Sequence, residues 1–172
     1  SRLLERLDRA GVEAVTLSFD RDRAGRSAAS RAVAAAGRAA RSPRIFVVEP
    51  ELLAPAKDPD ELVKTDGVER LRAAIADRQC GFRWHALELL NGVHPTSSVT
   101  HRREALARAG KWLGSLPPRL ALEQEDAVRE IASQCGYSVA AVERAFRARF
   151  WSAELTTLDR HRRAADVERS LC

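Results

Sequence analysis

The chain has 172 residues, enough to bury a hydrophobic core and to form one domain or two small ones. Its net charge is +5, and basic segments at residues 1–48 and 92–151 flank an acidic segment at residues 49–91. A basic surface favours a polyanionic partner such as nucleic acid. No stretch approaches the roughly 20 apolar residues of a membrane span, and no cleavable leader is recognisable. We therefore expect a cytoplasmic protein with no membrane partner.

The cysteine, histidine and methionine content bears on zinc binding and on whether the chain is a fragment. Three cysteines and four histidines are scattered without the spacing of zinc ligands, so zinc is not expected within this segment. Methionine is absent, and the chain opens in an apparent helix with Leu3, Leu4 and Leu7 at helical spacing. We therefore expect a fragment of a longer protein.

The first fifty residues alternate between helix and strand. A helix is expected over residues 1–10, followed by residues 12–19, whose apolar and β-branched side chains predict a strand buried on both faces. Asp22 is placed to cap an alanine-rich helix over residues 23–40, and residues 44–49 form the next strand. A strand, a crossover helix and a second strand predict a parallel βαβ unit, whose ligands gather at the carboxyl ends of the strands.

The remainder of the chain is expected to be entirely helical. A loop covers residues 50–59, and no convincing strand follows it. Residues 127–150 fit two interpretations: a helix-turn-helix whose Arg144 and Arg147 face DNA, or two packed helices of a bundle, which we prefer. The expected helices cover residues 60–65, 67–79, 81–91, 99–115, 120–135, 138–151 and about 153–170.

Two aspartates follow the first predicted strand. Asp20 and Asp22 are two residues apart, so in an extended chain both carboxylates project to the same side and can converge on one cation. Mg²⁺ prefers such hard oxygen ligands and usually takes one or two carboxylates, with phosphates and water completing its shell. The alternative is that Asp22 only caps the following helix and Asp20 is a loop residue.

A second pair of aspartates, Asp58 and Asp60, follows the second predicted strand. Because the carboxyl ends of parallel strands meet at the same edge of a sheet, we expect all four carboxylates there, where they would repel one another unless cations lay between them. Pro59 stiffens the presentation of this pair. The alternative is that Asp60 only caps a short helix.

Two stretches of the chain resemble a known family. They are LSFDRDRAGRSAASRA at residues 17–32 and KDPDELVKTDGVERLRAAI at residues 57–75. Together they look like the second half of the toprim domain of bacterial DnaG-type DNA primases, continuing into the helical subdomain of those enzymes. The D-x-D-x-x-G part is shared with topoisomerases and some nucleases, whereas D-P-D-E with its helical sequel is more particular to primases. The resemblance is good over residues 1–90 and looser up to residue 151.

The resemblance implies a fold class and a division of the chain. The fold is an α/β partial toprim, a Rossmann-like parallel sheet with a βαβ unit, followed by an all-α helical subdomain. The implied boundaries place the toprim portion at residues 1–79, the helical subdomain at 80–151 and a helical tail or linker at 152–172.

The resemblance also implies an activity: metal-dependent synthesis of short RNA primers from nucleoside triphosphates on single-stranded DNA template. Asp20 and Asp22 would be catalytic, and these two with Asp58 and Asp60 would bind Mg²⁺ or Mn²⁺. A replicative helicase would be a partner of the intact protein. A complete toprim domain also carries a Glu-Gly motif after an earlier strand, which nothing here supplies, so we expect this piece alone to be inactive.

Two other functions stay open at this point. One is another toprim enzyme, a nuclease or a topoisomerase; the latter needs a nucleophilic tyrosine, and Tyr137 has no supporting basic or acidic cluster. The other is a helical DNA-binding module in which the aspartate pairs only cap helices.

Basic residues beside the acidic pairs are candidates for nucleotide or nucleic-acid contacts. Lys57 precedes Asp58 and would reach a phosphate or triphosphate, or else it is an exposed loop lysine. Arg21, Arg23 and Arg26 would contact nucleic-acid phosphates, or else they balance the local charge.

Overall fold

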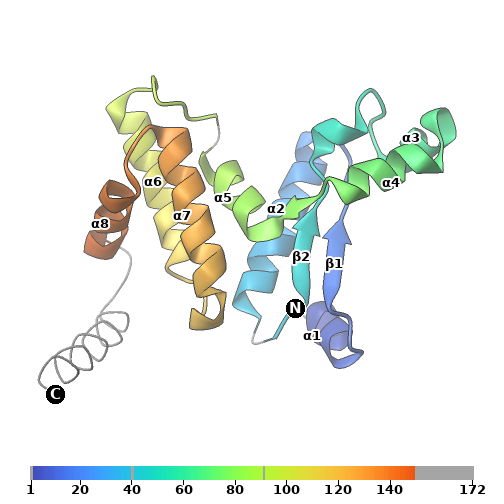
Figure 1. The fold of residues 1–172 in the computed structure, drawn as a ribbon, viewed down its shortest axis with the longest axis horizontal. Coiled ribbons are helices and arrows are strands. Elements are labelled where there is room, and N and C mark those ends of the chain that lie inside the picture. The colour runs from blue at the N-terminus through green and yellow to red at the C-terminus, as the bar shows by residue number, and fades with distance from the viewer. Residues whose placement is uncertain (1, 40, 91, 150–172) are drawn as a thin grey trace, which may run out of the picture.

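The computed structural model describes residues 2–39, 41–90 and 92–149, which form a small sheet with helices around it and a group of helices beyond it (Figure 1). Helix α5 lies between these two parts (Figure 1). The elements are α1 (Arg2–Arg9), β1 (Ala14–Leu17), α2 (Arg23–Arg38), β2 (Arg44–Val47), the 3₁₀ helix η1 (Pro50–Leu53), α3 (Pro59–Asp66), α4 (Val68–Ala76), β3 (Gln79–Cys80), α5 (Gly81–Leu90), α6 (Val99–Leu113), the 3₁₀ helix η2 (Pro118–Leu120), α7 (Ala121–Cys135) and α8 (Val139–Arg149).

The predicted parallel βαβ unit is present. Strands β1 and β2 pair in parallel, with Ala14 opposite Arg44 and Leu17 opposite Val47, and α2 connects them. The expected helices of the second half are present within a few residues of their predicted ends, except for the one at residues 153–170, which lies outside the described residues. The fold class is therefore confirmed as an α/β unit followed by a helical part.

Two predictions about strands were wrong. A third strand, β3, pairs antiparallel with β2 through Gln79 and Cys80, although no strand was expected there. Two residues are too few to show the alternating pattern that identifies a strand in a sequence. Strand β1 is not buried on both faces: Ala14 is exposed and the remaining residues of β1 are half-buried, because β1 is an edge strand of the described sheet.

The turn from β1 into α2 is closed by two residues. The Oδ1 atom of Asp22 accepts a hydrogen bond from the backbone N–H of Gly25 at 2.7 Å, which caps the first turn of α2. Gly25 packs directly on the preceding turn, where a Cβ atom would lie only 2.1 Å from the backbone oxygen of Asp20. Glycine is therefore required here because of a close approach of two backbone segments.

One apolar core runs from the sheet into the helical part. It includes Val33 of α2, Ile45 of β2, Trp84 of α5 and Ile131 of α7, all of which are buried. The predicted boundary at residue 79 stays a prediction, and apolar packing is continuous across it. A smaller cluster, centred on Leu62 of α3, lies against η1 and α4.

Helices α7 and α8 pack as the bundle interpretation predicts. Gly136 adopts a left-handed conformation, with φ of 69°, and ends α7. Ile131, Val142 and Phe146 are buried in the common core, whereas Arg144 is exposed.

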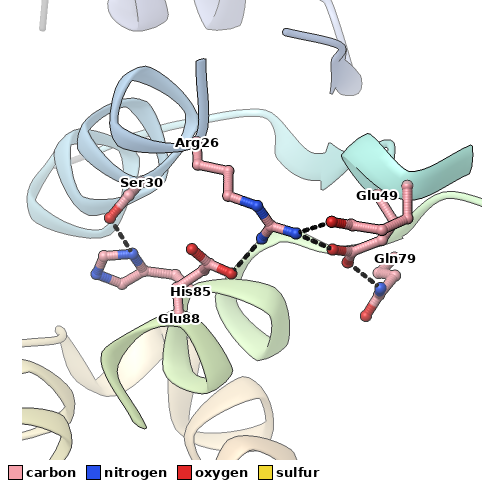
Figure 2. Close-up of polar contacts among 7 residues, drawn as sticks. Arg26, Ser30, Glu49, Gln79, His85 and Glu88 are labelled. Atoms are coloured by element: carbon pink, nitrogen blue, oxygen red, sulfur yellow. Dashed lines mark hydrogen bonds and ion pairs between the residues drawn. The ribbon is translucent and has the colours of Figure 1, made fainter. Parts of the chain in front are cut away.

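Arg26 joins α2 to three other parts of the fold (Figure 2). Its guanidinium donates to Glu88 of α5 at 2.5 Å, to Glu51 of η1 at 2.5 Å and to Glu49, which follows β2, at 3.3 Å. Glu49 also accepts a hydrogen bond at 2.7 Å from Gln79 of β3. We call Arg26, Glu49, Glu51 and Glu88 the Arg26 cluster. Its ion pairs connect the start of α2 to the sheet edge and to α5.

The Arg26 cluster places three carboxylates around one guanidinium, so their negative charges are only partly neutralised. Burial raises the pKa of Glu49 to about 7, and the neighbouring Glu51 adds to the rise, while Arg26 opposes it. The pKa of Glu51 is instead lowered, by hydrogen bonds within the cluster that outweigh its partial burial. Glu49 is therefore the carboxyl group of the cluster that titrates near neutral pH.

A second polar contact between α2 and α5 lies beside the cluster (Figure 2). The hydroxyl of Ser30 and the Nδ1 atom of His85 are 2.9 Å apart. His85 is buried and meets the ring of Trp112 edge-on at 4.4 Å. Burial, with a contribution from Arg38, lowers the pKa of His85 to about 4, so this histidine is a neutral packing residue at pH 7.

Replacing Gly25 with alanine should destabilise the chain, because the added methyl group would have to displace the backbone of Asp20. We expect Gly25→Ala to lower the free energy of unfolding by about 2 kcal/mol, the usual cost of forced overpacking. Urea denaturation measures this. The control, Ser27→Ala, changes an exposed position of the same helix and should stay within about 0.5 kcal/mol of wild type. Equal stabilities of the two variants would contradict the close approach.

The raised pKa of Glu49 predicts a pH dependence of stability. The folded chain keeps a proton that the unfolded chain, with a pKa near 4.5, has released, so this contribution is complete below about pH 4.5 and is lost as the pH rises through about 7. Between about pH 6 and pH 8 wild type should lose about 1 kcal/mol of unfolding free energy through this group. Glu49→Gln should abolish that loss, whereas Glu69→Gln, at an exposed ion pair with Arg72, should retain it. Identical pH profiles for wild type and Glu49→Gln would contradict the assignment.

Candidate functional site

The loops that carry the two aspartate pairs meet at one edge of the sheet. Because β1 and β2 are parallel, the segments that follow Leu17 and Val47 leave the sheet at the same end. The backbone N–H of Arg21 donates to the carbonyl of Lys57 at 2.6 Å, and the Nη2 atom of Arg21 donates to the carbonyl of Pro55 at 3.0 Å. The two acidic loops are therefore directly hydrogen-bonded to each other.

The first aspartate pair is exposed to solvent. Asp20 has no side-chain hydrogen bond or ion pair with any residue of the described ranges. Asp22 uses Oδ1 to cap α2 and has no described partner for its second oxygen. The capping interpretation of Asp22 is thus confirmed, and it leaves one carboxylate oxygen of Asp22 and both of Asp20 available.

In the second pair, Asp58 and not Asp60 is the helix cap. The Oδ1 atom of Asp58 accepts from the N–H of Glu61 at 2.7 Å, and Oε2 of Glu61 accepts from the N–H of Lys57 at 2.7 Å. The expectation that Asp60 caps this helix was wrong, because α3 begins at Pro59, one residue earlier than predicted. Pro59 suits the first turn of a helix because it has no N–H to satisfy there.

Asp60 is paired on the surface of α3. Its Oδ2 atom lies 2.5 Å from Nζ of Lys64, and this hydrogen bond raises the pKa of Lys64. A pocket of about 240 Å³ opens between Lys57, Asp58, Asp60, Glu61 and Lys64. Asp20 and Asp22 do not line it. Two lysines and three carboxylates make this a surface of mixed charge.

The described residues contain no group of three or more histidine, cysteine, aspartate or glutamate side chains arranged to hold a metal ion by themselves. Mg²⁺ does not require such a cage, since one or two carboxylates usually bind it together with substrate phosphates and water. The free oxygens of Asp20, Asp22 and Asp58 fit that demand. The metal site therefore stays a prediction. The free carboxylate oxygens at this edge are ligands of the kind that Mg²⁺ binds.

The basic residues have different surroundings. Lys57 and Arg23 are exposed, and in the described part of the chain neither side chain has a hydrogen-bonded partner. Arg21 reaches across to the second acidic loop. Arg26 is engaged by three carboxylates, so local charge balance, and not a phosphate contact, describes its place in this structure.

The Arg26 cluster itself was missed in the sequence. One signal was available: Glu49 and Glu51 follow the second strand, at the edge where Arg26 begins the crossover helix. The third carboxylate, Glu88, comes from α5, more than sixty residues after Arg26. No local pattern indicates which helix packs against the start of α2.

No helix among the described residues is long and apolar enough to cross a membrane. No protein-family model matches the chain, and no curated protein matches it.

The structural comparison gives a match to a solved structure described as the DnaG catalytic core. The TM-score is 0.57 and the sequence identity is 22%. The match covers 81% of this chain and 43% of the other, so the chain spans less than half of the length of that structure. The described chain therefore has the fold of part of the DnaG catalytic core, as its sequence motifs predict.

Proposed function

We propose that this chain is part of the catalytic core of a DNA primase, which acts in the cytoplasm and synthesises short RNA primers on single-stranded DNA from nucleoside triphosphates. The observation that carries the proposal is the direct hydrogen bonding of the two aspartate-bearing loops through Arg21 and Lys57. The match to the DnaG catalytic core supports it at the level of the fold. In the intact protein a replicative helicase is the further partner that the motifs imply.

The residues at this edge suit nucleotidyl transfer. Asp20, Asp22, Asp58 and Asp60 would hold Mg²⁺ or Mn²⁺, which when bound would neutralise the triphosphate and lower the pKa of the attacking 3′-hydroxyl. The N-termini of α2 and α3 begin beside the two pairs and add positive potential for phosphate. Lys57 lies beside Asp58 in an exposed loop and would contact the triphosphate.

The topoisomerase alternative finds no support in the surroundings of Tyr137. This tyrosine lies in the turn between α7 and α8. Both helices belong to the helical part, which α5 separates from the sheet (Figure 1). The guanidinium of Arg102 covers its ring at 4.7 Å, and the side chain is half-buried. The surroundings of Tyr137 are those of a packing residue.

Metal titration tests the proposed site. We expect Asp20→Asn and Asp58→Asn each to weaken Mn²⁺ binding at least about tenfold, because each removes a charged oxygen ligand from the shared edge. Isothermal titration calorimetry or Mn²⁺ paramagnetic resonance on the full chain measures the affinity. The control is Asp77→Asn, an exposed aspartate at the end of α4. If both test variants bind Mn²⁺ as wild type does, the aspartate pairs do not bind the ion and the proposal fails.

The alternative function, a helical DNA-binding module, predicts that Arg144 contributes to binding of duplex DNA. If α8 were a recognition helix, Arg144→Ala would weaken duplex DNA binding and reduce its salt dependence. We expect no such change, because α7 and α8 are packed into the core as a bundle. Fluorescence anisotropy with labelled duplex at several salt concentrations measures this, and a salt-dependent loss in Arg144→Ala would favour the module.

A further inference from the structure

Arg21 lies between the two aspartates of the first pair, yet its contacts are with the second acidic loop. Its guanidinium donates to the carbonyl of Pro55, 34 residues away in the sequence, at 3.0 Å. Its backbone N–H donates to the carbonyl of Lys57 at 2.6 Å. These bonds connect residue 21 to two points of the same loop.

Among the described residues, the side-chain hydrogen bonds of each aspartate pair run only to its own helix. Asp22 is bonded to Gly25 at the start of α2, and Asp58 is bonded to Glu61 at the start of α3. These caps set the direction of each pair but not the distance between the pairs. That distance depends on the parallel pairing of β1 with β2 and, locally, on the contacts that join the two loops.

Two attachment points constrain a loop more than one does. The second loop is anchored by the burial of Ala56 in the cluster around Leu62 and by the bond to Lys57. The bond to Pro55, two residues before Lys57, adds a second hydrogen-bonded attachment to residue 21. The guanidinium suits the task because it carries several donors in a rigid plane.

We propose that Arg21 is a positioning residue that clamps the loop at residues 55–58 against the turn at residues 20–22 and so sets the separation of the two aspartate pairs. The inference rests on the proposed function, since it assigns Arg21 a role in the same metal site. It adds a third role to the two that the sequence left open for Arg21, which were contact with nucleic-acid phosphates and local charge balance.

The sign of the effect on metal affinity separates a clamp from a simple charge effect. Arg21 carries a positive charge beside carboxylates, so its removal would strengthen Mn²⁺ binding if only charge mattered. Loss of the clamp would weaken Mn²⁺ binding, because the carboxylates would no longer be held at the separation that the ion requires. The two explanations therefore predict opposite changes.

The experiment compares Arg21→Gln, Arg21→Lys and Arg23→Gln in the full chain. Arg23→Gln removes the same charge two residues away, from a side chain with no described cross-loop bond. We expect Mn²⁺ affinity to fall roughly tenfold in Arg21→Gln, to recover in part in Arg21→Lys, which keeps one donor, and to stay equal or rise in Arg23→Gln. Affinity is measured by Mn²⁺ paramagnetic resonance.

Amide hydrogen exchange gives a second readout that needs no metal. The amide of residue 21 is the donor to Lys57, so its exchange should quicken severalfold in Arg21→Gln and remain at the wild-type rate in Arg23→Gln. If wild type fails to bind Mn²⁺, the proposed function fails, and quickened exchange in Arg21→Gln still supports the clamp. Unchanged exchange overturns the clamp. The clamp proposal is also overturned if Arg21→Gln binds Mn²⁺ as tightly as wild type or more tightly. A variant that loses only its affinity for single-stranded DNA would overturn it as well.

Discussion

Parallel pairing of β1 with β2 is the constraint on which the candidate site depends. The register from Ala14 opposite Arg44 to Leu17 opposite Val47 sends both following loops out at one sheet edge. Antiparallel pairing would have placed them at opposite ends, about four residues of strand apart. The crossover helix α2 can return the chain to that register only by approaching the backbone of Asp20 closely, which Gly25 permits. The βαβ topology and the glycine thus act together to bring the two aspartate-bearing loops to the same edge of the sheet.

The Arg26 cluster connects this edge to the helical part. Arg26 is one turn from Asp22, and the same guanidinium contacts Glu88 of α5, the helix that packs against α7. Gathering three carboxylates around one cation is costly where they are partly buried, and the raised pKa of Glu49 is the sign of that cost. The arrangement persists because α2 and α5 are held by the main apolar core and η1 by the smaller cluster around Leu62. The charged cluster therefore sets orientation more than it supplies stability.

Helix capping and metal binding are compatible roles for the same aspartates. One carboxylate oxygen of Asp22 and one of Asp58 accept a hydrogen bond from a backbone N–H. This bond fixes the rotamer of each side chain and leaves the other oxygen available. A carboxylate held in this way loses less conformational entropy when it takes up an ion. The capping role of these aspartates therefore does not exclude the metal binding that we propose.

The sequence by itself determined the parallel βαβ unit, the helices of the second half and the cap at Asp22, because each follows from local patterns in the chain. Tertiary structure alone decided the antiparallel strand β3, the exposure of β1, the three carboxylates around Arg26 and the reach of Arg21 to Pro55. These features join residues that are 23 to 62 positions apart, such as Arg26 with Glu49 and with Glu88. Which residues become partners depends on how the helices and strands pack, and the spacing of residues along the chain does not indicate that packing.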